Sequence, residues 1–112
     1  MKKYKVKFAP EFFDQLLDVE DFIARNSKSE LIADRYTKSV KEYCKTFKTA
    51  AERGTRRDDL MPGIRIVGFD STVLAFSVQE DEVWFLGVFY GGQDYESYIP
   101  SRPSVFGIKV MK

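Results

Sequence analysis

The fold of the chain is best predicted from residues 72–90, TVLAFSVQEDEVWFLGVFY. The two parts of this stretch, residues 72–79 and 82–90, consist largely of β-branched and aromatic residues, which favour strands. Only Glu80 and Asp81 separate them, so the stretch predicts two antiparallel strands joined by a tight turn. The glycine that such turns favour is missing, and the sequence leaves the turn type open.

The second of these strands is apolar on both of its faces, because residues 83–89 include no charged side chain. A strand with this pattern belongs in the centre of a sheet. We expect the helices to cover one face, and the tail of the chain or a partner to cover the other. Gly87 interrupts the strand and indicates either a β-bulge or the close approach of another backbone.

The segment before this hairpin predicts a third strand at residues 64–69, connected by a turn at Asp70 and Ser71. The three strands would form an antiparallel meander. Residues 54–63 combine charged and turn-forming side chains without periodicity, so we predict a loop there.

The N-terminal half of the chain predicts one strand and two helices. Residues 4–8 alternate between apolar side chains and lysines, which is the period of a half-buried strand. Apolar residues then recur at helical spacing over 11–24, after a proline suited to a first helical turn. Ser27 and Glu30 have the spacing of a capping box that opens a second helix, ending near residue 51. The sequence thus predicts a two-layer α+β fold: an N-terminal strand, a helical hairpin and a three-stranded antiparallel meander.

The bulk composition fits one small folded domain. The chain has 112 residues, and hydrophobic residues make up 44% of them. We therefore predict a single domain over residues 1–112, in which residues 98–112, rich in proline and glycine, form an extended C-terminal tail. The net charge is only +1, so a basic binding site would have to be a local patch.

The residue types exclude several classes of chemistry. The chain has no histidine and a single cysteine, Cys44, which excludes Ser-His and Cys-His nucleophile systems and argues strongly against a metal site. We expect no metal and no cofactor. No segment approaches the ~20 apolar residues that span a bilayer, and lysines break up the N-terminal region where a signal peptide would be apolar. With one cysteine, a cytoplasmic location is the expectation.

Three motifs resemble a known family of bacterial toxins. Residues 53–65 contain Arg-Gly, then Arg-Asp-Asp-Leu, then Pro-Gly-Ile-Arg, which resembles the "RG…RDDL.PG.R" run of many ParE-type toxins. Residues 89–96, FYGGQDYE, resemble the end of their last core strand, and residues 8–11, FAPE, resemble their entry from strand to helix. The chain therefore resembles the RelE/ParE toxin superfamily over about residues 1–97 and is nearer to its ParE side.

The resemblance implies a toxin of a bacterial type II toxin–antitoxin system, encoded beside a cognate antitoxin that wraps around it and neutralises it. Growth inhibition and plasmid stabilisation are the roles that such a toxin implies. ParE-like members inhibit DNA gyrase and are not nucleases, whereas RelE-like members cut messenger RNA in the ribosome. The motifs favour gyrase as the target, with the ribosome and messenger RNA as the alternative.

The alternative nuclease would depend on Arg65 together with Tyr95 or Tyr98. Arg65 matches an arginine that RelE-type nucleases use on the strand after the loop, where it would steady the charge on a phosphate. A tyrosine can move a proton. The next arginine of the nuclease pattern is replaced by Gln93, which carries no charge and cannot act as a guanidinium.

For contact with the target or the antitoxin, two interpretations compete. In the functional one, the binding residues are Arg53, Arg56, Arg57, Arg65, Tyr90, Gln93 and Tyr95. In the structural one, Arg57 or Arg65 pairs with Asp58, Asp59 or Asp94 and pins the loop to the sheet. We favour the structural interpretation for the two adjacent aspartates and for the tyrosines, and weigh both equally for Arg56 and Arg65. The antitoxin is expected to lay an apolar segment along the sheet and the helices, where an extended segment could pair with a strand edge.

Overall fold

The protein, analysed as a computed structural model that describes residues 2–91 and 93–101, is built on a five-stranded sheet. The strand order is β1-β5-β4-β3-β2, in which β1 lies parallel to β5 and the other neighbours are antiparallel. The strands are β1 (Lys5–Phe8), β2 (Thr55–Arg56), β3 (Ile64–Phe69), β4 (Thr72–Gln79) and β5 (Glu82–Tyr90). The predicted α+β fold is confirmed, with the strongly apolar β5 inside the sheet. The predicted loop at 54–63 contains one further strand, β2.

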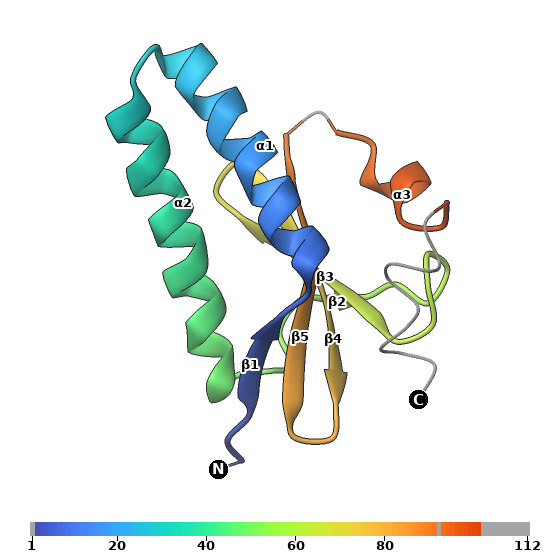
Figure 1. Ribbon diagram of the computed structural model, residues 1–112. Helices are drawn as coiled ribbons and strands as arrows, with labels where there is room; N and C mark the ends of the chain where they lie inside the picture. Colours follow the sequence, from blue (N-terminus) through green and yellow to red (C-terminus); the bar gives the residue numbers. More distant parts are fainter. Residues whose placement is uncertain (1, 92, 102–112) are drawn as a thin grey trace.

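Two helices form an antiparallel hairpin on one face of the sheet (Figure 1). They are α1 (Pro10–Ser27) and α2 (Glu30–Lys45), and a short 3-10 helix, η1 (Thr46–Lys48), follows α2. The predicted capping box at Ser27 is wrong. Ser29 caps α2 by accepting a hydrogen bond from the Ile32 N–H, while the Ser27 hydroxyl donates to the Ile23 carbonyl of α1. Lys28 makes the turn between the helices in the left-handed conformation, at φ 58°.

A β-bulge interrupts the pairing of β4 with β5. Ala75 pairs with Gly87 and Phe76 with Phe85, so Leu86 has no partner of its own. The bulge that Gly87 indicated is confirmed. As a result Phe85 and Val88 face the helices, whereas Leu86 and Phe89 face the opposite side. The Val88 N–H donates to the side-chain oxygen of Gln15 in α1 at 2.9 Å, which fixes α1 to the sheet.

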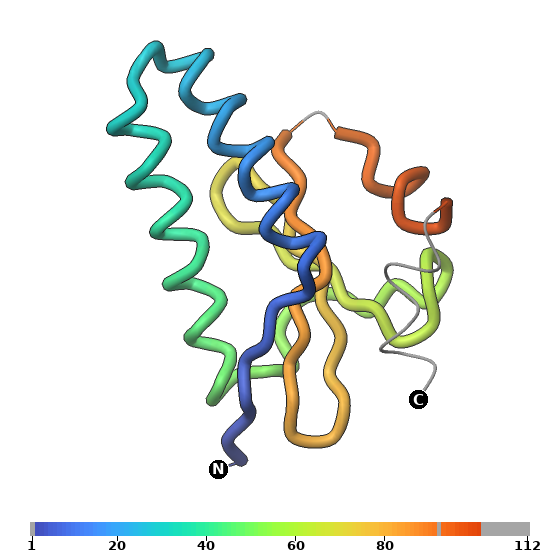
Figure 2. The backbone as a smooth tube through the Cα atoms, viewed as in Figure 1, coloured from blue at the N-terminus to red at the C-terminus, as the bar shows by residue number. Residues whose placement is uncertain are grey.

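Apolar side chains fill both sides of the sheet. The larger cluster lies between the sheet and the helical hairpin and includes Phe12, Leu16, Val40, Phe47, Phe76 and Phe85. The second lies on the other face and comprises Ala9, Leu60, Ile64, Ala75, Leu86, Phe89 and Ile99. The short helix α3 (Tyr95–Tyr98) and the loop between β2 and β3 lie on this second side, as Figures 1 and 2 show. The second face of β5 is thus covered by α3 and the loop between β2 and β3, and within the described residues only Tyr98 and Ile99 of this cover belong to the predicted tail.

The predicted extended tail starts too early. Tyr98 ends the α3 turn, and the Ile99 side chain that follows is fully buried. The rest of the predicted tail, residues 102–112, lies outside the described residues. The assignment of one domain to residues 1–112 stays a prediction.

Candidate functional site

Two arginines face each other across the edge of the sheet. Arg56 of β2 is the direct antiparallel partner of Arg65 of β3, so both side chains leave the same face. This is the face that carries the helices, because Arg65 alternates with Ile64 and Ile66, which pack on the other side. The two arginines line a cavity of about 240 Å³ together with Glu52, Gly63 and Val78.

The two arginines of this pair have different partners. Arg56, which is exposed, forms an ion pair with Asp58 at 2.9 Å. Arg65 is half-buried, and its one hydrogen bond to the described part of the chain is a long one of 3.4 Å to the carbonyl oxygen of Arg53. Within residues 2–91 and 93–101, no carboxylate lies within ion-pair distance of the Arg65 guanidinium. The half-buried guanidinium of Arg65 therefore lines the cavity with N–H donors that could bind a ligand there.

Arg53 ties the start of the arginine-rich segment to the end of α2. Its guanidinium lies 4.5 Å from the ring centre of Phe47 and 5.3 Å from that of Tyr43. It also donates to the Thr46 hydroxyl at 2.8 Å. These cation–π and hydrogen-bonding contacts give Arg53 a structural role.

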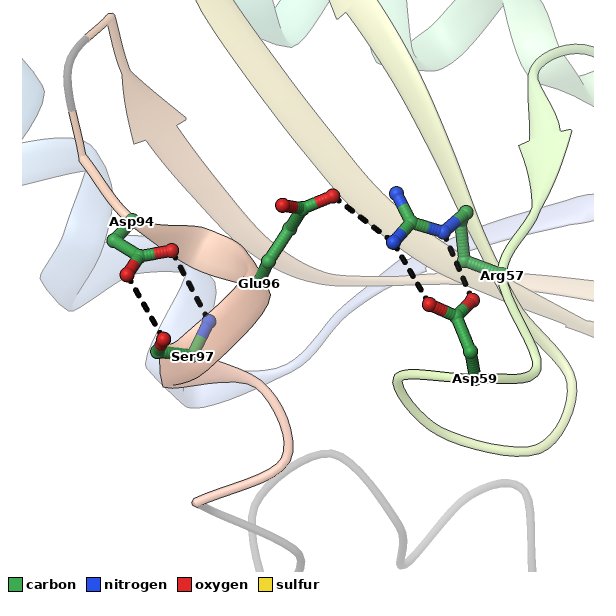
Figure 3. A network of polar contacts seen from close by, with 5 residues as sticks. All are labelled: Arg57, Asp59, Asp94, Glu96 and Ser97. Atoms are coloured by element: carbon green, nitrogen blue, oxygen red, sulfur yellow. Dashed lines mark hydrogen bonds and ion pairs between the residues drawn. The ribbon is translucent and has the colours of Figure 1, made fainter.

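Arg57 points to the opposite face of the sheet from Arg56. It donates two hydrogen bonds to Asp59, at 2.9 and 2.8 Å, and forms an ion pair with Glu96 of α3 at 2.9 Å. Figure 3 shows the guanidinium between the two carboxylates, bridging the loop and α3. In the same view Asp94 caps α3 through the N–H and hydroxyl of Ser97.

The electrostatics of this loop agree with the structural interpretation of its carboxylates. The hydrogen bonds from Arg57 lower the pKa of Asp59, and the hydrogen bonds to Asp59 and Glu96 raise the pKa of Arg57. The pKa of Asp58 is lowered first by the hydrogen bond from the Gly63 N–H, at 2.7 Å, and then by Arg56. Arg57 does pair with an aspartate, Asp59, but both residues belong to the loop, and Glu96 rather than Asp94 connects the loop to α3.

The remaining predicted site residues lie elsewhere in the fold. The Tyr90 ring stacks on Phe22 of α1 at 4.2 Å. Gln93 accepts a hydrogen bond from the Tyr90 N–H at 2.9 Å and so closes the turn after β5. The rings of Tyr95 and Tyr98 pack against Phe89 on the second face of the sheet. The structure therefore brings Arg56 and Arg65 together and separates Arg57 and the tyrosines from them.

A further surface was not among the predicted site residues. The helical hairpin exposes the apolar side chains of Phe13 (46%), Leu17 (63%), Leu31 (58%) and Ile32 (49%). Two neighbouring depressions run between α1 and α2, and Leu17 lines both. The sequence led us to expect an apolar antitoxin segment along the sheet and the helices, but it did not identify which helix residues would contact that segment. The signal was the width of the apolar stripe of α1, since apolar residues at 12, 13, 16 and 17 cover more than the face that packs on a sheet.

The described part of the chain lacks both a metal-ligand cluster and a membrane-spanning helix. No group of three or more histidine, cysteine or carboxylate side chains there could hold a metal ion. None of the described helices is long and apolar enough to cross a membrane.

The fold is shared with a solved structure of a toxin–antitoxin system. A chain from the chromosomal ParDE toxin–antitoxin system of P. aeruginosa matches with a TM-score of 0.67 and 18% sequence identity, over 80% of this chain and 97% of that one. At this identity the likeness defines the class of fold. The sequence model of the ParE toxin of the type II toxin–antitoxin system parDE matches residues 6–95, and the chain therefore belongs to the ParE toxin family. No curated protein sequence matches the chain.

Proposed function

We propose that this ParE-family protein is a cytoplasmic toxin that binds and inhibits DNA gyrase, catalyses no reaction itself, and is neutralised by a cognate antitoxin. The observation that carries the non-catalytic part is the separation of the candidate nuclease residues. Arg65 faces the helix side of the sheet, whereas Tyr95 and Tyr98 pack on the opposite side. Groups that stabilise a phosphate and move its proton must reach the same substrate, and these groups lie on two faces.

Gyrase inhibition is tested with purified toxin and gyrase in a supercoiling assay. We expect the toxin to block supercoiling and to leave DNA relaxation by an unrelated type I topoisomerase unchanged. Gyrase that supercoils normally at toxin concentrations matching those that stop growth would contradict the proposal.

The second candidate function is cleavage of messenger RNA in the ribosome. One observation favours it. Arg65 lines a cavity beside Arg56, and Arg65 has no carboxylate partner among the described residues, so its guanidinium could bind a phosphate. Mapping of transcript ends after toxin induction decides between the two functions. Cuts at fixed codon positions that disappear in Arg65→Gln would establish cleavage, and an unchanged transcript map would exclude it.

The antitoxin's docking surface is proposed to include the outer side of the helical hairpin. An apolar helical segment would cover the exposed side chains of Phe13 and Leu17, which line the depressions between α1 and α2. The charged side chains on this surface change sign along its length. Acidic residues line the depressions toward the tip of the hairpin, and Lys38 and Lys41 line them further down α2. A complementary antitoxin segment would carry basic residues at one end and acidic residues at the other.

The docking surface is tested by co-purification with the product of the neighbouring gene. We expect Leu17→Lys to weaken the complex strongly, because it puts a charge in the middle of the apolar contact. Ser39→Lys adds the same charge on the other side of α2 and should leave binding unchanged. Equal binding by both variants would place the antitoxin elsewhere.

A further inference from the structure

The Arg56–Arg65 pair sets two like charges side by side at the edge of the sheet. Like charges in direct cross-strand positions destabilise a sheet, and one of these is half-buried. Asp58 compensates Arg56 only. Among the described residues, the Arg65 guanidinium donates the 3.4 Å hydrogen bond described above and has no carboxylate within ion-pair distance. This pairing of two cations, of which one is half-buried and lines a cavity, favours the binding of an anion there.

We propose that the cavity lined by Glu52, Arg56, Gly63, Arg65 and Val78 binds a carboxylate side chain of the antitoxin. Arg65 would hold it with a bidentate pair of hydrogen bonds, the geometry for which a planar guanidinium is suited. This anchor rests on the proposed antitoxin binding and adds a polar contact at the sheet edge to the apolar contact on the helices.

The surroundings of the cavity favour a single carboxylate over a nucleic-acid backbone. Glu52 lines the cavity, and Asp58 lies beside Arg56. These negative charges would repel the phosphates that flank a bound one, whereas an isolated carboxylate brings a single charge. Val78 adds an apolar wall that suits the methylene stem of an aspartate or glutamate. The net charge of +1 also gives the chain no long-range pull toward a polyanion.

The cavity is first probed directly, with the full-length toxin and small anions. N-acetylglutamate and inorganic phosphate are titrated while the backbone amide resonances of Gly63 and Val78, which line the cavity, are followed by NMR. We expect saturable shifts with N-acetylglutamate that are absent in Arg65→Gln. A single-stranded oligonucleotide forms the third arm. Tighter Arg65-dependent binding of the oligonucleotide than of N-acetylglutamate would overturn the choice of carboxylate and favour a nucleic acid.

The contact with the antitoxin is then measured as a dissociation constant. A charge-assisted contact of this kind corresponds to a loss of roughly tenfold to hundredfold in affinity for Arg65→Gln. Arg65→Lys keeps the charge but not the bidentate geometry, so its affinity should lie between those of the wild type and Arg65→Gln. Lys3→Gln, which removes an exposed positive charge near the N-terminus and away from the helical hairpin, is the matched control and should bind like the wild type.

The free toxin supplies a readout that a merely structural arginine would not give. Relief of the Arg56–Arg65 repulsion should leave the thermal midpoint of free Arg65→Gln no lower than that of the wild type. A variant that loses both stability and affinity would overturn the proposal in favour of a structural role. Unchanged affinity in Arg65→Gln overturns the carboxylate site alone, whereas a wild-type toxin that does not bind the antitoxin at all overturns the proposed pairing itself.

Discussion

Replacement of Gln15 by leucine tests how the bulge in β5 and helix α1 depend on each other. Gln15 is 8% exposed, and its side-chain oxygen accepts the Val88 N–H at 2.9 Å. Val88 is itself fully buried, two residues beyond the unpaired Leu86. Leucine has a similar size but no acceptor, so Gln15→Leu would leave a buried backbone N–H without its partner.

The expected loss follows from that single unsatisfied group. Leaving a buried donor unpaired costs about 1–3 kcal/mol of unfolding free energy. For a domain of about this size, 1 kcal/mol corresponds to roughly 5 °C in thermal midpoint, so we expect a decrease of about 5–15 °C. The Val88 amide should also exchange with solvent faster than its neighbours in β5, because the opening is local.

Denaturant unfolding and hydrogen exchange read out the two effects. Gln79→Leu is the matched control, since Gln79 lies at the end of β4 and its side chain makes only a 3.5 Å contact with the Ser77 hydroxyl. The control should retain wild-type stability. If Gln15→Leu unfolds with the wild-type midpoint and the Val88 amide stays protected, then Gln15 does not satisfy this N–H and the reasoning is refuted.

Three further outcomes follow from individual residues. Gly54→Ala should lower the unfolding free energy by about 1–3 kcal/mol, because φ is +79° and an added Cβ would lie 2.5 Å from a backbone oxygen of β3. Gly68→Ala is the control and should be nearly neutral in denaturant unfolding, because its Cβ would lie 4.0 Å from the Thr72 carbonyl oxygen, an ordinary contact distance. The Cys44 thiol, whose pKa burial raises to about 12, should resist iodoacetamide at pH 8 in the folded protein and react once it is unfolded, as mass spectrometry would show. The pKa of Asp58 is lower in the folded than in the unfolded state, so its contribution to stability is complete above about pH 4, the unfolded value, and is lost as the pH falls through the folded value. Asp58→Asn should therefore flatten the acid side of a stability–pH curve, and a curve that keeps the wild-type slope would exclude this role.

The strands and helices could be predicted because their signals are local. The strands at 64–69, 72–79 and 82–90 match their predicted bounds, since β-branched and aromatic runs ended by turn residues define them. The helix caps failed because two serines, Ser27 and Ser29, compete for one boundary. Only the left-handed conformation of Lys28 decides between them, and that choice depends on how the hairpin closes. The two-residue strand β2 is too short for any periodicity and exists only through its pairing with β3.

The candidate site was harder to predict because it depends on which face each side chain leaves. Arg56 and Arg57 are neighbours in sequence and point to opposite faces, a consequence of strand alternation that could be applied only once β2 was known. The position of Tyr95 and Tyr98 follows from α3, a single turn whose capping by Asp94 has no strong sequence signal. Motifs therefore identified the arginine-rich segment, but not the division of its residues between two surfaces.

The bulge explains why one narrow sheet can support two surfaces. Without it, strict alternation would put Leu86 and Val88 on the same face. Because Leu86 has no partner in β4, Val88 turns to the helix side and Phe89 to the other, where α3 packs. In the N-terminal half of β5, Phe85 aligns with Arg65 across the sheet, because both pair with Phe76 of β4. The C-terminal half of β5 contacts α1 on one face of the sheet and α3 on the other. Deleting Leu86 would place Phe85 and Gly87 next to each other opposite Phe76 and Ala75, as a regular ladder, and would keep Val83, Phe85 and Val88 on the helix side. The bulge therefore adds Leu86 itself, a fully buried side chain of the cluster on the second face, and its deletion should weaken that cluster and leave the helix-side core in place.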